Sequence, residues 1–369
     1  MSLHAFSGAP LDPLMAAASV PGQSLSFLQA RAAALPSFPD VDRLLHDGWR
    51  HGVDAALAVN LPRLSNAGGE VFSGSVAAER LADVRTSAIH ALLLWEQRAR
   101  RIGSCLEAGG VPPLLLLKGG ALRYQVYPEP WLRAAADLDL LVPEGQLERA
   151  VQALVDNGAE VHLPVVERRW SMRHGHHVTV RQDGFHVELH RSVDQGDRPL
   201  LSHVALSDGA VPLSAVHGHL LLPRLSGQAL VCAAHALKHG LNIPLKNLVD
   251  LHCLAVCGAF SDEDEVVRQA RAEKLDGVLG YLLSCAVELL ATNVPEGLLL
   301  ALRPPLPWTL LTRAVLSPWR DGFFPAALGR DTPLRRLAAH LLLVADGRFV
   351  AGVGTRFLTR RLHDLTDRG

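Results

Sequence analysis

The chain has 369 residues, of which 49% are hydrophobic and 20% are charged, so it is long enough to bury a core and too apolar for a disordered protein. Its 36 lysines and arginines nearly balance 37 aspartates and glutamates. This balance excludes a global basic field for nucleic acid and leaves only a local basic groove open. Five cysteines without a CxxC pair are typical of reduced thiols in a cytoplasmic protein.

No targeting or membrane segment is expected. The first 22 residues lack a basic region followed by a long apolar core, so no signal peptide is predicted. The most apolar later stretch, 277–291, contains Glu288 and is too short to cross a bilayer. We therefore expect a cytoplasmic protein without membrane partners.

The first part of the chain, residues 1–109, is predicted to be a helical region. Apolar residues recur at intervals of three and four in the segments 24–34, 41–58 and 75–108. The third segment is followed by Gly109-Gly110, a pair that favours the end of a helix.

A mixed pattern of strands and helices follows over residues 110–195. The apolar run Leu114–Leu117 predicts a buried strand, and Gly119-Gly120 then leads into a helix at 121–127. The remaining elements expected here are strands at 138–142, 160–165, 176–181 and 185–190 and a helix at 144–157. The last two strands are joined by Asp183-Gly184, a dipeptide that favours the tight turn of a hairpin.

Residues 196–369 are predicted to form a second, mostly helical region. The helical pattern resumes at Leu225, and Ser261 is the expected N-cap of a later helix, with Asp264 three residues after it. Further helices are expected at 266–272, 276–292 and 334–345. The predicted organisation is therefore a mixed centre between two helical regions.

Three carboxylates of the mixed centre have the order and spacing of a metal site. Strand alternation places Asp137 and Asp139 on one face, where the two carboxylates repel each other unless a cation lies between them. The hairpin strand that contains Glu188 can bring a third carboxylate alongside. Hard divalent ions such as Mg²⁺ prefer oxygen ligands and share them with phosphates, as in two-metal phosphoryl or nucleotidyl transfer.

The Gly119-Gly120 pair supplies a phosphate site next to these carboxylates. Glycines between a strand and a helix let the backbone approach a phosphate closely, and the helix N-terminus has free N–H groups. We therefore expect triphosphate at the glycines and metal at Asp137 and Asp139 to form one site.

The mixed centre resembles the uncharacterised nucleotidyltransferase family of the DNA-polymerase-β-like superfamily in the run LLLLKGGALRYQVYPEPWLRAAADLDLLV, followed by VELH. That superfamily has a strand, a Gly-Gly or Gly-Ser turn, a helix, a strand with paired acidic residues, and a third acidic residue on a later strand. The resemblance covers residues 93–190 well and the helical remainder loosely. It implies an α+β fold, in which a polymerase-β-like core with a small mixed sheet is flanked by N-terminal and C-terminal helical regions.

The resemblance also implies roles for individual residues. Asp137, Asp139 and Glu188 would be the catalytic metal ligands, and Gly119 and Gly120 would hold the triphosphate. The chain departs from the superfamily pattern in two ways: Gly120 stands where serine is frequent, and Glu188 has a longer side chain than aspartate. Both departures are compatible with altered or lost activity.

The cations beside this motif have two interpretations each. Lys118 could contact phosphate or could be a strand-end lysine that extends to water, and Arg133 could steady phosphate or the acidic pair or lie on the surface. Lys238 and His239, one turn after His235, could form a helical wall of the active cleft that contacts substrate or phosphate, or could pack between helices.

Histidines are concentrated in the segment 174–190, at His174, His176, His177, His186 and His190. Such a patch could bind a transition metal, but its spacing matches no standard zinc site, so a polar wall of the active site is favoured. Next to Glu188, His190 could orient the acceptor or move a proton.

These observations favour an enzyme that uses Mg²⁺ or Mn²⁺ to move an NMP from an NTP, such as ATP, to a hydroxyl or phosphate, with release of pyrophosphate. Neutral charge and 5% aromatic residues disfavour a nucleic-acid acceptor, so a small molecule, sugar, peptide or protein is expected. By family analogy the reaction is biosynthetic. Two alternatives stay open: a catalytically weak module that binds nucleotide or peptide, and a metal-dependent hydrolase that uses the histidine patch.

Overall fold

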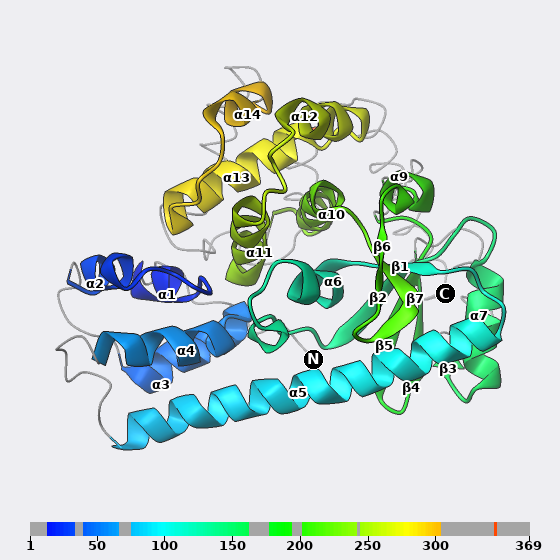
Figure 1. The fold of residues 1–369 in the computed structure, drawn as a ribbon, viewed down its shortest axis with the longest axis horizontal. Helices are drawn as coiled ribbons and strands as arrows, with labels where there is room; N and C mark the ends of the chain where they lie inside the picture. Colours follow the sequence, from blue (N-terminus) through cyan, green and yellow to red (C-terminus); the bar gives the residue numbers. More distant parts are fainter. Residues whose placement is uncertain are drawn as a thin grey trace, which may run out of the picture.

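The computed structural model describes residues 13–33, 40–65, 75–161, 177–193, 201–241, 244–303 and 343–344 (Figure 1). The helix expected at 334–345 therefore lies outside the described residues, apart from two positions, as do residues 162–165 of an expected strand. His174 and His176 of the histidine patch lie outside them as well.

A seven-stranded mixed sheet is the centre of the fold, with the strand order β3-β4-β5-β2-β1-β7-β6. The strands are β1 (Leu114–Leu116), β2 (Asp137–Leu141), β3 (Glu160–Val161), β4 (His177–Gln182), β5 (Phe185–His190), β6 (Val211–Leu213) and β7 (His217–Leu222). The pairs β2/β5 and β1/β7 are parallel, and the other four pairs are antiparallel. The expected α+β class is confirmed, and the sheet continues with β6 and β7 beyond residue 195, where a domain boundary is predicted.

Helices cover both faces of the sheet. One face packs its leucines and valines against α5 (Ser75–Ala108) and α7 (Leu147–Asp156). The other face packs against a larger apolar cluster to which α6 (Lys118–Gln125), α10 (Leu225–Lys238), α11 (Leu245–Val256) and α13 (Asp276–Leu290) contribute. Around this cluster lie α9 (His203–Ser207), α12 (Glu263–Ala272) and α14 (Glu296–Ala301). The candidate site lies on this second face.

The N-terminal helices form a separate small core. It unites α1 (Pro13–Ala18), α2 (Leu25–Ala33), α3 (Val41–His51) and α4 (Asp54–Ser65), and Leu81 of α5 packs into it. The 34-residue helix α5 passes along the sheet and continues beneath α3 and α4 (Figure 1). It thus packs against both the sheet and the N-terminal helices.

The structure corrects two local expectations. The single helix expected at 41–58 is two helices, because Gly52 adopts a left-handed conformation with φ +66° and ends α3. The N-cap of α12 is Asp262 and not Ser261: its side chain accepts a hydrogen bond from the Glu265 N–H at 3.1 Å. Sequence alone did not separate two adjacent residues that both favour an N-cap.

The predicted hairpin is confirmed. Strands β4 and β5 pair antiparallel, and φ is +51° at Asp183 and +77° at Gly184. Two consecutive positive φ values are those of the type I′ turn that suits a two-residue hairpin loop. This turn sets the register that places Glu188 and His190.

Within the described residues, no helix has both the length and the apolar character needed to cross a membrane.

Candidate active site

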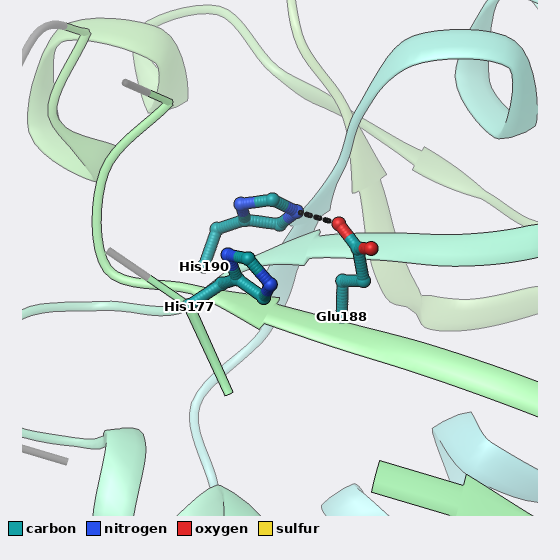
Figure 2. A group of neighbouring side chains, drawn as sticks. All are labelled: His177, Glu188 and His190. Atoms are coloured by element: carbon teal, nitrogen blue, oxygen red, sulfur yellow. Dashed lines mark ion pairs between the residues drawn. The ribbon is translucent and has the colours of Figure 1, made fainter. Parts of the chain in front are cut away.

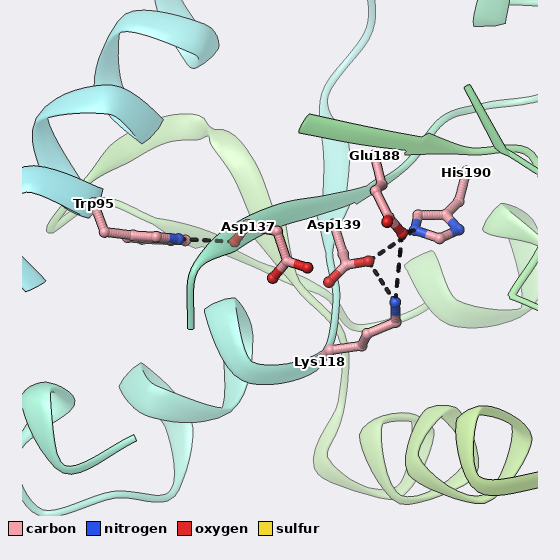
Figure 3. Close-up of polar contacts among 6 residues, drawn as sticks. All are labelled: Trp95, Lys118, Asp137, Asp139, Glu188 and His190. Atoms are coloured by element: carbon pink, nitrogen blue, oxygen red, sulfur yellow. Dashed lines mark hydrogen bonds and ion pairs between the residues drawn. The ribbon is translucent and has the colours of Figure 1, made fainter. Parts of the chain in front are cut away.

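The predicted acidic pair lies on strand β2, on the face that carries the helical cluster. Leu138 and Leu140 are fully buried on the opposite face, against α5 and α7. Alternation along the strand therefore turns Asp137 and Asp139 toward α6, α10 and α11. Figure 3 shows both carboxylates on the side of β2 that faces Lys118. The indole N–H of Trp95 donates to the Asp137 carbonyl at 2.9 Å and fixes the start of the strand from α5.

The parallel register of β2 and β5 brings the third carboxylate next to this pair. Asp139 is opposite Glu188, and Leu141 is opposite His190. The His190 ring extends back along the strand to Glu188, with Nε2 3.2 Å from Oε2 (Figure 2). The same Nε2 lies 2.8 Å from Asp139 Oδ1. Because ionised carboxylates only accept hydrogen bonds, Nε2 is the protonated nitrogen of this ring.

Lys118 closes the network between the two carboxylates (Figure 3). Its Nζ lies 2.5 Å from Asp139 Oδ1 and 3.8 Å from Glu188 Oε2. The backbone of Lys118 has φ +54°, a left-handed conformation that is uncommon for a residue with a side chain. This conformation occurs at the first residue of α6, where the chain leaves β1 and turns the ammonium group toward β2 and β5.

The network controls the protonation of its carboxylates. Burial favours the neutral acid and raises the pKa of Asp139, but Lys118 and His190 together outweigh it and hold that pKa below its ordinary value. The hydrogen bond from His190, assisted by Lys118, holds the pKa of Glu188 well below its ordinary value. At Asp137, in contrast, burial and the neighbouring Asp139 raise the pKa, and Lys118 offsets this only in part. Asp139 and Glu188 are thus anionic at neutral pH.

A cavity of about 280 Å³ opens beside these groups. The sheet side of its lining consists of residues from α6, the segment 133–136 and β2: Lys118, Gly119, Leu122, Arg133, Ala134, Ala135, Ala136, Asp137 and Asp139. The helical side consists of residues from α10, α11 and the residue before α11: Cys232, His235, Pro244, Lys246, Asn247 and Asp250. The cavity therefore lies between the face of the sheet at the start of β2 and two helices that are about 100 residues further along the chain.

Arg133 is not on the surface: it joins the two sides of this cavity. Its guanidinium donates two hydrogen bonds to the Asp250 carboxylate, from Nε at 2.6 Å and from a terminal nitrogen at 2.8 Å. Tyr127 donates a third, at 2.7 Å, and all three side chains are buried. Burial lowers the pKa of Arg133, but the attraction of Asp250 exceeds this effect and raises it. Arg133 thus forms a bidentate ion pair that holds α11 against the sheet. Its contact with phosphate or with the acidic pair stays a prediction.

The two glycines after Lys118 face different surroundings. They lie within the first turn of α6, which begins at Lys118 and not at residue 121 as expected. A Cβ added at Gly119 would lie 2.9 Å from a terminal nitrogen of Arg133, and Gly119 lines the cavity. At Gly120 a Cβ would lie 3.0 Å from a Leu116 methyl group and 3.1 Å from the Trp95 ring. Gly119 is thus beside the cavity, whereas Gly120 serves close packing of α6.

A family model described as uncharacterised nucleotidyltransferase matches residues 39–291. The chain belongs to this nucleotidyltransferase family. The match extends well beyond the motif from which the resemblance was inferred, and it includes helices α3 to α13. The sheet with its helices fits a polymerase-β-like core. No curated protein and no solved structure matches the chain.

For a nucleotidyltransferase, the donor chemistry of this site fits a divalent metal. Asp137, Asp139 and Glu188 offer carboxylate oxygens from one face of two paired strands, and these are the ligands that Mg²⁺ prefers. The Lys118 ammonium lies where positive charge is needed between Asp139 and Glu188. The carboxylate oxygens of Asp137, Asp139 and Glu188 therefore suit a divalent cation such as Mg²⁺.

A second group of metal-ligating atoms adjoins the first. Ligand atoms of His177, Glu188 and His190 all lie within 4.8 Å of one another, and the two imidazole rings are 5.3 Å apart (Figure 2). Burial and the proximity of His190 lower the pKa of His177 to about 4, so this ring is neutral at pH 7 and able to ligate. The set of two imidazoles and one carboxylate is softer than the acidic group and suits a transition metal.

The helical side of the cavity contains residues for which the sequence predicts no role. Lys238 and His239 are not among the cavity-lining residues, whereas His235, one turn earlier, is. Lys246 and Asp250 also line the cavity, and no role was predicted for them. The chain has only four lysines, and two of them line the cavity, so this scarcity was a usable signal for Lys246.

Proposed function

We propose that the protein is a Mg²⁺- or Mn²⁺-dependent nucleotidyltransferase that transfers an NMP from an NTP to a hydroxyl or phosphate group and releases pyrophosphate. The observation that carries the proposal is the alignment of three carboxylates, Asp137, Asp139 and Glu188, on one face of two parallel strands, where Asp137 and Asp139 line a cavity. Membership of a nucleotidyltransferase family supports the same reaction class.

The residues of the site have different proposed roles in nucleotidyl transfer. Asp137, Asp139 and Glu188 would hold the metal, which when bound neutralises charge on the reacting phosphates. Lys118 and His190 keep Asp139 and Glu188 ionised and oriented. As the acceptor oxygen bonds to the α-phosphorus, the bond to pyrophosphate breaks and pyrophosphate leaves with that electron pair; a hydroxyl acceptor passes its proton to solvent water, and an ionised phosphate acceptor has none to lose. The low pKa of Glu188 makes it a weak base, so its position favours metal ligation over proton abstraction.

The acceptor is proposed as a class only. The near-zero net charge and the low aromatic content disfavour a long nucleic-acid track. The cavity of about 280 Å³ is at the small end for ligand sites and is lined by six charged side chains. A small molecule, a sugar, or a side chain of a peptide or protein is therefore the proposed acceptor.

The decisive variant is Asp137→Asn. Asp137 has no hydrogen bond or ion pair through its carboxylate among the described residues, and burial with a neighbouring like charge raises its pKa. Neutralising it removes a metal ligand without breaking a contact. We expect pyrophosphate release to fall by a factor on the order of 10³ while the free energy of unfolding stays equal or rises.

The assay compares each of the four NTPs, with Mg²⁺ or Mn²⁺, against a panel of hydroxyl and phosphate acceptors. Asp183→Asn is the matched control, because it changes an exposed aspartate in the hairpin turn. Full NMP transfer by Asp137→Asn would refute the assignment. A metal-dependent thermal shift with an NTP but no pyrophosphate release in any reaction would favour the binding module instead.

A metal-dependent hydrolase is the second candidate, and the group His177, Glu188 and His190 is the observation that favours it. Elemental analysis of the purified protein decides between the two. One zinc per chain that is lost in His177→Ala and kept in Asp137→Asn supports a hydrolase. Protein without zinc, in which Mg²⁺ supports NMP transfer, supports the nucleotidyltransferase.

A further inference from the structure

The charged residues that line the cavity are not all paired. Lys118 pairs with Asp139, and Arg133 pairs with Asp250. Across the described part of the chain, no hydrogen bond or ion pair satisfies the Asp137 carboxylate or the Lys246 ammonium. One anion and one cation thus remain without partners, on opposite sides of the same cavity.

Lys246 is held in place by its neighbours. It lies in the first turn of α11, and its stem packs beneath the corner between α3 and α4. A Cβ added at Gly52 would lie 2.6 Å from the Lys246 Cδ, so the stem of Lys246 lies close against this glycine. The aliphatic part of the side chain thus lies beside the residue that ends α3, while the residue lines the cavity.

We infer that Lys246 binds the polyphosphate tail of the nucleotide, from the wall opposite the metal ligands. This inference rests on the proposed function. A metal–triphosphate complex carries a cation at one end and several negative charges at the other, so it complements both unpaired groups: the metal meets Asp137 and the phosphates meet Lys246. A neutral ligand or a simple cation would complement at most one of them.

The electrostatics of the lysine agree with this role. Burial, with a contribution from Arg133, lowers the pKa of Lys246 to about 8, although Asp250, Asp137 and Asp54 act in the opposite direction. Its charge is therefore poorly compensated within the chain. A polyanion beside the ammonium would restore the compensation, so the group is suited to a ligand that brings negative charge.

The test compares wild type with Lys246→Met, which keeps the length of the side chain and removes its charge. The probes are inorganic tripolyphosphate, which needs no base recognition, the four NTPs, and the four nucleoside monophosphates, each with Mg²⁺. We expect calorimetry to show tripolyphosphate and the preferred NTP bound on the order of 10- to 100-fold more weakly by the variant. Binding of the matching monophosphate should change less than twofold.

Two further variants separate charge from packing. Lys274→Met removes the same charge at the end of α12, away from the cavity lining, and should bind every probe as wild type does. Lys246→Arg restores the charge and should recover part of the affinity. If Lys246→Met does not fold, Lys246→Arg and Lys246→Gln make the same comparison.

The outcomes distinguish the inference from the function on which it rests. Wild-type affinity for tripolyphosphate and NTP in Lys246→Met overturns the inference and leaves nucleotidyl transfer standing. An equal loss for triphosphate and monophosphate also overturns it, because the lysine would then not act on the tail. Absence of binding by wild type to all NTPs and to tripolyphosphate overturns the proposed function itself.

Discussion

The two walls of the cavity are built in different ways. The sheet wall (Lys118, Gly119, Asp137 and Asp139) follows from local rules: a strand, a turn with glycines, and alternation along the next strand. The helical wall (His235, Lys246, Asn247 and Asp250) exists only because α10 and α11 dock on the same face of the sheet. A short motif therefore reveals one half of the site, and the other half requires the tertiary structure.

The charge networks of the two walls also differ. Asp139 shares one oxygen between Lys118 and His190 and lines the cavity, and no hydrogen bond to its second oxygen is found among the described residues. Asp250 uses both oxygens for a buried arginine and accepts a further bond from Tyr127. The first network belongs to the proposed metal site, and the second joins the two walls.

Loss of the connection between the walls should have the largest effect on stability. Arg133→Met leaves the Asp250 carboxylate buried without its cation, and we expect the free energy of unfolding to fall by about 3–5 kcal/mol. Urea denaturation measures the change. The double variant Arg133→Met/Asp250→Leu removes both charges and should recover most of the loss. A fall below about 1 kcal/mol in the single variant would show that the pair does not hold the walls.

Acid should weaken the support of the helical wall in particular. His51, at the end of α3, is buried, and its Nδ1 accepts from the N–H of Leu245, the first residue of α11, at 3.3 Å. Burial lowers its pKa from 6.5 to about 4, so the folded state favours the neutral ring. The stability that this provides is present above pH 6.5 and is lost as the pH falls toward 4.

The expected size of this loss is on the order of 3 kcal/mol between pH 7 and pH 4. Chemical denaturation at a series of pH values measures it, with His51→Asn as the comparison, because an amide does not titrate. Parallel pH dependence of wild type and variant would exclude His51 as the titrating group.

Substitution of the two glycines of α6 should change stability less than loss of the Arg133–Asp250 pair, and it should distinguish the roles of the two glycines. In Gly120→Ala the methyl group meets Leu116 and Trp95, and we expect a net loss of about 1 kcal/mol after the gain in helix propensity, with activity retained. In Gly119→Ala the methyl group meets the clamped Arg133 beside the cavity, and pyrophosphate release should fall at least tenfold. Thermal unfolding and the transfer assay together separate the two, and equal activity losses would contradict the different roles.

Much of the sheet side was predictable. Strand β5 was placed at its observed bounds, β1, β2 and β4 were placed to within one residue, and α5 was placed at both ends. The hairpin dipeptide and the alternation of side chains along the strands were enough to predict that Asp139, Glu188 and His190 lie on one face. For Lys118 the sequence leaves a phosphate contact or a strand-end lysine that extends to water. Its contacts with Asp139 and Glu188 are not predicted, since a side-chain direction set by φ +54° is not visible in a sequence.

The rest depended on information that no local pattern contains. Strands β6 and β7 were missed because their few residues, with Pro212 in β6, form strands only by pairing with β1 and with each other. For Arg133 the sequence leaves phosphate, the acidic pair or the surface, because its partner Asp250 is 117 positions away. For Lys246 the scarcity of lysine is the one signal in the sequence, and its place in the cavity lining is visible only in the tertiary structure.

The buried pair of Arg133 and Asp250 also bears on how the candidate site can be transplanted or evolve by recombination. A fragment cut after residue 195 would contain Arg133 without its anion and β1 without its parallel neighbour β7. The segment that contains the acidic motif is therefore not expected to fold as an independent unit. It can be inherited, fused or grafted into another protein only together with the helices that follow it.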